Sequence, residues 1–309
     1  MGLIFGAVLP VAPTNVDWFG LTMKWIGWDG SEWTLTDESD GTVLMPGVRG
    51  LNMPPIIHHR AAHASVPGAR WRGSTVDVRP VFWPLQVFCS TSSADWIARD
   101  SAFWGTMDPT RTGTWVVITP DGRQRRLQLR FTDDTDFSMN HDSVLEGWSN
   151  YGITLNAEQP YWEGDPLGGL WSPGTSSQFF GGTGAPSFYI SPGGTLAEAA
   201  IDNPGDVQTY VLWQIYGPIS SATVGVNGRN ITIPFAIADG QMLEIDTDPR
   251  AQQAMQGPVG GELTVDMTGS LGAIDFAPLP PKQTVNLSLS MSGTGEIAAR
   301  FTPLYYRAW

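Results

Sequence analysis

Residues 203–250 form a ladder of apolar runs separated by tight-turn signals, and this pattern constrains the fold more than any other part of the chain. Within residues 210–216, 224–226 and 231–233, every second side chain falls on one face, as in a half-buried antiparallel sheet. Asn227 and Gly228 supply the two positive φ angles that a tight hairpin turn needs. The run carries no catalytic signature, so it predicts an antiparallel sheet and not an active site.

The size and composition of the chain favour two β domains. A chain of 309 residues exceeds the usual size of one hydrophobic core, and 41% hydrophobic residues are enough for two. Gly (36) and Pro (24) are abundant and no long helical periodicity is present, so we predict a mainly β protein. The opening residues lack the basic segment of a signal peptide, and no run approaches the about 20 apolar residues of a membrane helix, so neither is expected.

The formal net charge is −13 and the acidity is spread evenly over both halves of the chain. This argues against nucleic-acid binding, because a nucleic-acid binder neutralises phosphates with clustered Lys and Arg. The nearest approach to a basic patch is the set Arg123, Arg125, Arg126 and Arg130. We interpret these arginines as solvated strand positions or as part of an interface. The single cysteine, Cys89, excludes an intramolecular disulfide.

In the first half, the sequence predicts a hairpin over residues 21–35, a loop-rich stretch over 47–73, and strands within 74–89. Pro80 and Pro84 remove ladder donors, so this last region is expected at an edge or a bulge. One helix is expected, over residues 93–104. Ser92 can cap it, with Asp95 three residues further on.

A hairpin is expected over residues 114–131, because Pro120-Asp121-Gly122 has the chemistry of a type I turn with a bulge. Alternation places Leu127 and its apolar neighbours on one face of its second strand, and Arg126, Gln128 and Arg130 on the other. A strand over 149–156 should close the first domain.

The predicted domain boundary lies near residue 165. Residues 166–187 are rich in Gly, Pro and Ser and read as a linker, although 178–180 and 187–190 could be short strands. Further strands are expected over 261–267 and 285–291. The prediction is therefore a β-sandwich-like domain with one helix over residues 1–165, followed by a second β-sandwich over 166–309.

The order of the pieces in residues 203–250 resembles a known family. Asn-Pro-Gly-Asp is followed by a strand ending in Gly217-Pro218, then by a hairpin, and then by Asp239-Gly240 leading into Leu-Glu-Ile-Asp-Thr-Asp-Pro-Arg. This order is similar to that of the galectin-like C-terminal domain of distal tail proteins, which form the ring at the tip of long non-contractile phage tails. The order of elements in the first half is similar too, and the final Arg307-Ala308-Trp309 resembles the ends of family members from actinobacterial phages.

The resemblance implies a structural virion protein of the tail tip, assembled in the host cytoplasm and without enzymatic activity or cofactor. It implies a homo-hexameric ring that joins the tail tube protein to a tail-associated hub or fibre protein, with DNA passing through the lumen without specific binding. Cyclic assembly reuses one heterologous contact, and unpaired strand edges or a polar hairpin face can supply it. The candidate contact is therefore the hairpin over 114–131, with the side chains Arg123, Arg125, Arg126, Gln128 and Arg130.

The acidity allows a further expectation about the lumen. Cationic patches there would hold phosphates and slow DNA, whereas an acidic ring would repel DNA over about 8 Å at physiological salt. We therefore expect lumen-facing side chains to be neutral or acidic, with simple solubility as the alternative reason for the charge.

Other functions have weaker sequence support. A carbohydrate- or receptor-binding tail protein is the main alternative, and Trp213 would then be the residue that stacks on a sugar. A β-sandwich glycoside hydrolase is the third, because paired carboxylates perform that chemistry; its candidate groups are Asp133, Asp134, Asp136, Glu158, Glu163 and Asp165. His58, His59 and His63 invite a metal site but lack companion ligands, so we interpret them as loop histidines. No metal site is expected.

Overall fold

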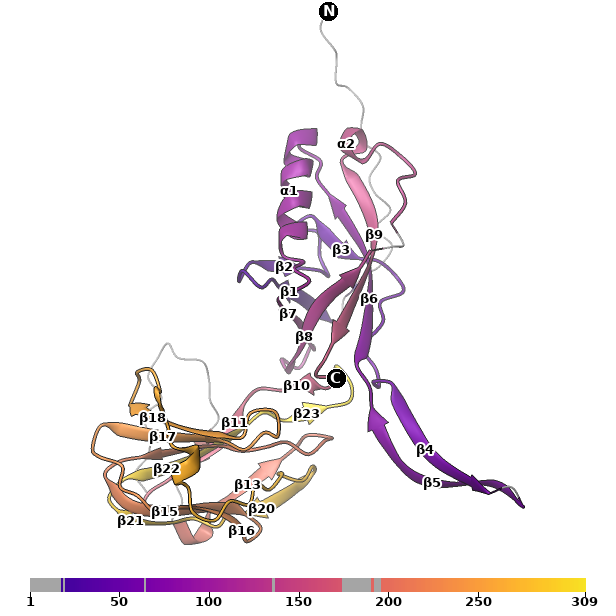
Figure 1. Ribbon diagram of the computed structural model, residues 1–309. Coiled ribbons are helices and arrows are strands. Elements are labelled where there is room, and N and C mark those ends of the chain that lie inside the picture. Colours follow the sequence, from indigo (N-terminus) through magenta and orange to yellow (C-terminus); the bar gives the residue numbers. More distant parts are fainter. Residues whose placement is uncertain (1–17, 19, 64, 135–136, 174–189, 192–195) are drawn as a thin grey trace, which may run out of the picture. The chain divides into compact units, whose positions relative to one another are not determined.

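The computed structural model describes residues 18, 20–63, 65–134, 137–173, 190–191 and 196–309 (Figure 1). Strands hold 49% of the residues and helices 8%, so the mainly β prediction is confirmed. The chain divides into two compact units, one of residues 1–162 with 306–309 and the other of residues 163–305. The sequence placed the division near residue 165 and assigned the whole C-terminus to the second domain. The last four residues instead belong to the first unit.

Unit 1 contains a curved antiparallel sheet in the order β2-β1-β7-β8-β9-β6-β3 (Figure 1). Its strands are β1 (Thr22–Ile26), β2 (Glu32–Thr34), β3 (Thr42–Leu44), β6 (Arg79–Phe88), β7 (Gly113–Ile118), β8 (Gln124–Asp133) and β9 (Trp148–Ala157). The terminal strands β2 and β3 approach one another: the Leu44 N–H in β3 donates to the carbonyl of Leu35, which follows β2, at 2.8 Å. Tryptophans fill the interior, with the rings of Trp25 and Trp115 each 5.3 Å from that of Trp83.

Helix α1 (Ser93–Gly105) lies against this sheet and begins as the sequence predicts. The Ser92 hydroxyl accepts a hydrogen bond from the Asp95 N–H at 3.1 Å and donates to the Asp95 carboxylate at 2.8 Å. Trp96 and Phe103 are its buried side chains. A second, one-turn helix, α2 (Ser143–Glu146), was not expected.

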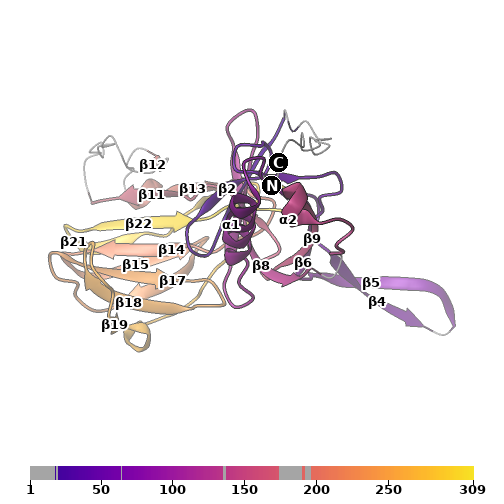
Figure 2. The ribbon, with the colours of Figure 1, turned by 90° about the horizontal axis from the view of Figure 1, so that it is seen from above.

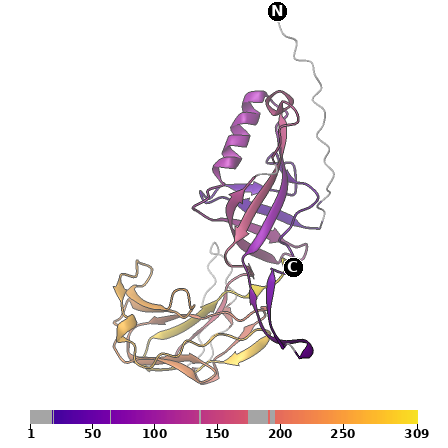
Figure 3. The same ribbon diagram turned by 45° about the vertical axis from the view of Figure 1, so that its right-hand side comes forward.

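The remaining element of unit 1 is a separate two-stranded sheet, β4 (Ile56–His63) and β5 (Val66–Val76), which extends away from the main sheet (Figures 1 and 3). The loop-rich stretch predicted over residues 47–73 is therefore wrong from Ile56 onward, whereas residues 47–55 lie outside any strand or helix. The prediction of a sheet edge or bulge at Pro80 and Pro84 agrees with the structure in part. Strand β6 pairs with β9 along its whole length, but β3 covers its other side only over Leu85–Val87. Next to β3, that side has a bridge from Arg49 to Phe82 and a hydrogen bond from the Met45 N–H to the Pro84 carbonyl at 2.7 Å.

Unit 2 is a β-sandwich. Its larger sheet has the order β12-β11-β22-β14-β17-β18-β19, and its facing strands form sheets of the orders β16-β15-β21 and β13-β20. The larger sheet consists of β11 (Leu167–Trp171), β12 (Ile190–Ser191), β14 (Leu212–Tyr216), β17 (Gln241–Asp246), β18 (Gln253–Pro258), β19 (Val265–Asp266) and β22 (Glu296–Phe301). The facing strands are β13 (Ala200–Asn203), β15 (Ile219–Val226), β16 (Arg229–Ile233), β20 (Gln283–Asn286) and β21 (Ser290–Gly293). Trp213 and Ile215 from one layer meet Val224 and Ile231 from the other in the core.

Short elements complete the chain. The 3-10 turns are η1 (Leu196–Glu198) and η2 (Thr268–Ser270), and the strands β10 (Trp162–Glu163) and β23 (Leu304–Tyr305) occur where the chain passes from one unit to the other.

The predictions for the second half are confirmed in some places and wrong in others. The turn at Asn227-Gly228 is confirmed, with φ of 52° and 78°. The strand expected over residues 285–291 is wrong as a single element, because it divides between β20 and β21 in different sheets. Part of the predicted linker is strand β11, paired with β22. The possible strand at 178–180 lies outside the described residues, as do all but the last residue of that at 187–190.

Candidate assembly surface

The β4–β5 hairpin is exposed on both faces over most of its length. Its register pairs Ile56 with Val76 at the base and Arg60 with Trp71 further out, with an irregularity between His59 and Arg60. The side chains of Ile57 and Trp71 are 48% and 60% exposed. A two-stranded hairpin is at best marginally stable in water unless a further surface covers it. This hairpin therefore has the properties of an element that is completed by another molecule.

Local hydrogen bonds hold the hairpin's own side chains. Trp71 Nε1–H donates to His58 Nδ1 at 3.2 Å, and His59 Nε2 lies 3.1 Å from the Thr75 hydroxyl. The histidines are thus on a strand, and their interpretation as loop residues is wrong. The described residues contain no group of three His, Cys, Asp or Glu side chains that could hold a metal ion.

The hairpin is basic in an acidic chain. Residues 41–76 contain no Asp or Glu, while the hairpin carries Arg60, Arg70 and Arg72. All three arginines are exposed. Arg60 lies opposite Trp71 on one face, whereas Arg70 is next to Trp71 along the strand and so points to the other. Arg72 is the extra residue at the irregularity in the register. Arg and Trp are the side chains most enriched at the energetic centres of protein interfaces. The 36-residue absence of carboxylates is the sequence signal that could have identified this surface.

Arg79 fixes the base of the hairpin. It is the first residue of β6, which is separated from the end of β5 by two residues, and it is 1% exposed. Its guanidinium donates to the carbonyls of Gly50 (2.6 Å) and Asn52, which precede β4, so one side chain holds both ends of the hairpin. It also donates to Pro160 O at 2.6 Å and Tyr306 O at 2.7 Å. Burial lowers the pKa of Arg79 to about 10, although Tyr161 opposes the shift, and the group remains protonated at neutral pH.

The C-terminal residues pack at the same base. Ala308 is 1% exposed, and its N–H donates to the Leu51 carbonyl at 2.8 Å. Arg125 Nη1 donates to the Arg307 carbonyl at 2.6 Å. The Arg307-Ala308-Trp309 ending therefore acts as a strap within unit 1, alongside the chain segment that enters β4.

The arginine hairpin expected from the sequence is β7–β8, and the structure places it inside the sheet. Strand β7 pairs with β1 and β8. Strand β8 pairs with β7 over residues 124–129, with β9 over residues 130–133, and also with β10. Leu127 and Leu129 are 0% exposed, as the alternation predicted, and Gly122 has φ +84° in the turn.

Each predicted interface side chain contacts a neighbour in its own unit. Arg123 Nε lies 2.7 Å from Asp121 Oδ2, and Arg130 Nε lies 2.8 Å from Glu158 Oε1. Arg126 donates to Gln124 at 3.0 Å, and Gln128 Oε1 accepts from the Thr114 hydroxyl at 3.2 Å. Arg125 holds the strap. Hydrogen bonds from Thr119 and then Arg123 lower the pKa of Asp121. The role of these residues in an interface stays a prediction.

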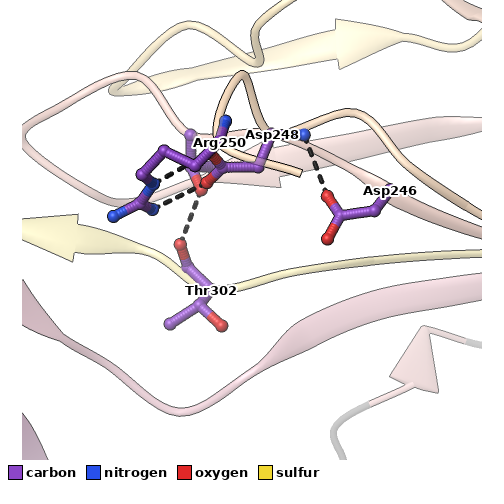
Figure 4. Close-up of polar contacts among 5 residues, drawn as sticks. Asp246, Asp248, Arg250 and Thr302 are labelled. Atoms are coloured by element: carbon purple, nitrogen blue, oxygen red, sulfur yellow. Dashed lines mark hydrogen bonds and ion pairs between the residues drawn. The ribbon is translucent and has the colours of Figure 1, made fainter. Parts of the chain in front are cut away.

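Unit 2 keeps its candidate sugar residue inside the core. Trp213 is 1% exposed, so it cannot stack on a sugar in this structure. The family-like Asp-Thr-Asp-Pro-Arg segment is a turn locked by its own side chains (Figure 4). Asp246 Oδ1 accepts from the Asp248 N–H at 2.9 Å, and Arg250 Nη2 lies 2.7 Å from Asp248 Oδ2. The hydrogen bond from Arg250 lowers the pKa of Asp248.

Of the carboxylates considered for a glycosidase, Glu158 is engaged by Arg130, and Asp136 lies outside the described residues. Among the helices that the structure describes, none is long and apolar enough to cross a membrane.

No protein-family model and no curated protein sequence matches the chain. Solved structures do match its fold. The Dit protein of phage SPP1, described as a paradigm of the hub adsorption apparatus in phages that infect Gram-positive bacteria, matches with a TM-score of 0.63 at 14% identity, over 92% of this chain and 98% of that one.

Two structures of the phage P2 baseplate in its activated conformation, one with calcium and one with strontium, match with TM-scores of 0.53 at 14% identity. Each covers 91% of this chain and 97% of its own. The fold is thus that of phage hub and baseplate proteins. Among these, the resemblance to distal tail proteins is confirmed at the level of fold.

Proposed function

We propose that the protein is a structural component of a phage tail tip that assembles with further copies of itself. The observation that supports this proposal is the fold match to the SPP1 hub protein, which covers 92% of this chain and 98% of that one and therefore includes both units. A shared fold does not by itself transfer function. The exposed β4–β5 hairpin adds an independent reason, because it has strand edges and apolar side chains that only another surface can cover.

The proposed assembly is a ring, with six copies as the resemblance implies. The ring would join the tail tube protein to a tail-associated hub or fibre protein, in a virion assembled in the host cytoplasm. DNA would pass through the lumen without specific binding, past neutral or acidic side chains. In this role the protein needs no catalytic residue and no cofactor.

The test replaces residues 57–75 by Asn-Gly, which closes the hairpin at the Ile56–Val76 pair with a tight turn. The mass of the full chain and of this variant is measured by mass photometry. We expect closed oligomers from the full chain and monomers from the variant, with thermal unfolding of both units unchanged. Electron microscopy of the oligomer should show a ring with an opening wide enough for duplex DNA. A full chain that stays monomeric at all accessible concentrations would contradict self-assembly, and rings from the variant would exclude the hairpin.

A further inference from the structure

A second charged surface of unit 1 has the opposite sign to the hairpin. Residues 29–40 contain five carboxylates and no Lys or Arg. They are Asp29, Glu32, Asp37, Glu38 and Asp40, and all but Asp40 are exposed. We call this set the acidic edge, because it follows β2, a terminal strand of the sheet, and the loop from β2 to β3. Lys24 Nζ lies 3.6 Å from Glu32 Oε2.

The acidic edge and the hairpin lie on different sides of unit 1. In Figures 1 and 2 the β4–β5 hairpin leaves the main sheet on the side away from β2. A single copy therefore presents a basic projection on one side and an acidic surface on the other. Two different complementary patches on one molecule are what a heterologous, head-to-tail contact requires, and such contacts generate rings when the rotation closes.

We propose that the β4–β5 hairpin of one copy docks on the acidic edge of the next copy. The proposal rests on the proposed self-assembly and names the surface that receives the hairpin. Arg60, Arg70 and Arg72 would lie near enough to the carboxylates for ion pairs, from both faces of the hairpin, while Trp71 and Ile57 would lose their exposure in the contact. Arginine suits this role because its planar guanidinium binds carboxylates in a bidentate geometry.

The alternative partner for a basic, tryptophan-bearing hairpin is a nucleic acid. Three arginines in a chain of net charge −13 form a small attractive patch within a repulsive field, which favours a protein surface of opposite charge over phosphates. A copy of the same chain supplies such a surface at the same concentration as the hairpin.

The experiment uses charge reversal with rescue in the full chain. One variant carries Arg60→Glu, Arg70→Glu and Arg72→Glu, and the other carries Glu32→Arg, Asp37→Arg and Glu38→Arg. Each alone should assemble roughly 100-fold more weakly than the unmodified chain, because like charges now meet at every contact. Mixed in equal amounts, they should assemble as the unmodified chain does, since alternating copies restore an opposite-charge pair at each contact.

Salt dependence gives a second readout. Assembly of the unmodified chain should weaken between about 50 mM and about 500 mM NaCl, because exposed charges are screened. A charge-matched control carries Arg123→Glu, Arg229→Glu and Lys282→Glu, which are exposed positions elsewhere, and it should assemble normally.

The outcomes separate this proposal from the broader one. Failure of the mixture to assemble, while the hairpin deletion also abolishes assembly, would leave self-assembly intact and overturn the acidic edge as its partner. Binding of a labelled DNA duplex that is lost on hairpin reversal, with oligomer formation unchanged, would assign the hairpin to nucleic acid. A monomeric unmodified chain would overturn both proposals.

Discussion

Unit 1 contains two hairpins that carry arginines, and they differ in what surrounds them. In β7–β8, the apolar side chains Leu127 and Leu129 are 0% exposed and both strands are paired on both sides. In β4–β5, none of the residues whose burial is described is buried, and the two strands pair only with one another. The first hairpin is therefore part of the core, whereas the second has no covering layer among the described residues.

The difference shows what alternation can and cannot reveal. Alternation identifies a strand with one buried face, which β8 has. A hairpin that is exposed on both faces has no such face, so its sequence carries Ala, Gly, His and Arg without a period and resembles a loop. Charge is the remaining signal. Arginines in β8 have partners within unit 1, whereas the hairpin lies in a stretch without a single carboxylate.

The largest expected contrast comes from shortening one apolar side chain in each hairpin. Leu127→Ala should lower the free energy of unfolding by about 3 kcal/mol, because it leaves a cavity in the core. Ile57→Ala removes a half-exposed side chain and should change that free energy by less than about 0.5 kcal/mol while weakening assembly. Chemical denaturation of the isolated chain and mass photometry measure the two effects. Equal losses of stability would show that β4–β5 belongs to the core after all.

The next largest effect is expected from replacing Arg79, the residue that anchors the β4–β5 hairpin. Arg79→Met keeps the side-chain volume but leaves the carbonyls of Gly50, Asn52, Pro160 and Tyr306 without this donor, so unfolding should become easier by roughly 2 kcal/mol. The hairpin should also lose its fixed direction, which limited trypsinolysis detects as faster cleavage at Arg60 and Arg70.

The matched control is Arg49→Met. Arg49 lies in the same region, 5.4 Å from the Phe82 ring centroid, and is exposed. Cleavage rates that are equal in the two variants would argue against Arg79 as the anchor.

Much of the sheet and little of the assembly surface could be predicted from the sequence. The cap at Ser92, the turn at Gly122 and the turn at Asn227-Gly228 rely on local chemistry, and each was correctly placed. Arg79 was not identified, because its partners are backbone carbonyls that are distant in sequence and carry no residue-type signal. For the same reason the sequence did not show that Ala308 returns to unit 1. Trp213 was ambiguous, since a buried and a sugar-binding tryptophan look alike in an alternating strand.

A smaller change in stability is expected from replacing a glycine by alanine in each hairpin, at two positions with similar positive φ angles. Gly122 in the β7–β8 turn has φ +84° and Gly68 in β5 has φ +91°, and neither has an atom within 4 Å of an added Cβ. Alanine at either position costs about 1 kcal/mol locally. Gly122→Ala should lower global stability by about that amount, because its hairpin unfolds with the sheet. Gly68→Ala should leave the thermal midpoint unchanged, because the tip of β4–β5 opens independently. Equal shifts in calorimetry would show that both hairpins unfold cooperatively.

The smallest expected effect tests the interface first predicted from the sequence. The triple variant Arg123→Ala, Gln128→Ala, Arg130→Ala removes polar side chains from β7–β8 but spares Arg125, which holds the C-terminal strap. The ion pairs it breaks are largely exposed, so the thermal midpoint should move by less than about 2 °C. If β4–β5 is the assembly element, the oligomer should form with unchanged mass and unchanged salt dependence. If instead this variant is monomeric while the Arg60, Arg70 and Arg72 reversal still assembles, the two hairpins exchange roles: the contact lies on the exposed face of the sheet itself, and the free hairpin is available for a partner other than a second copy.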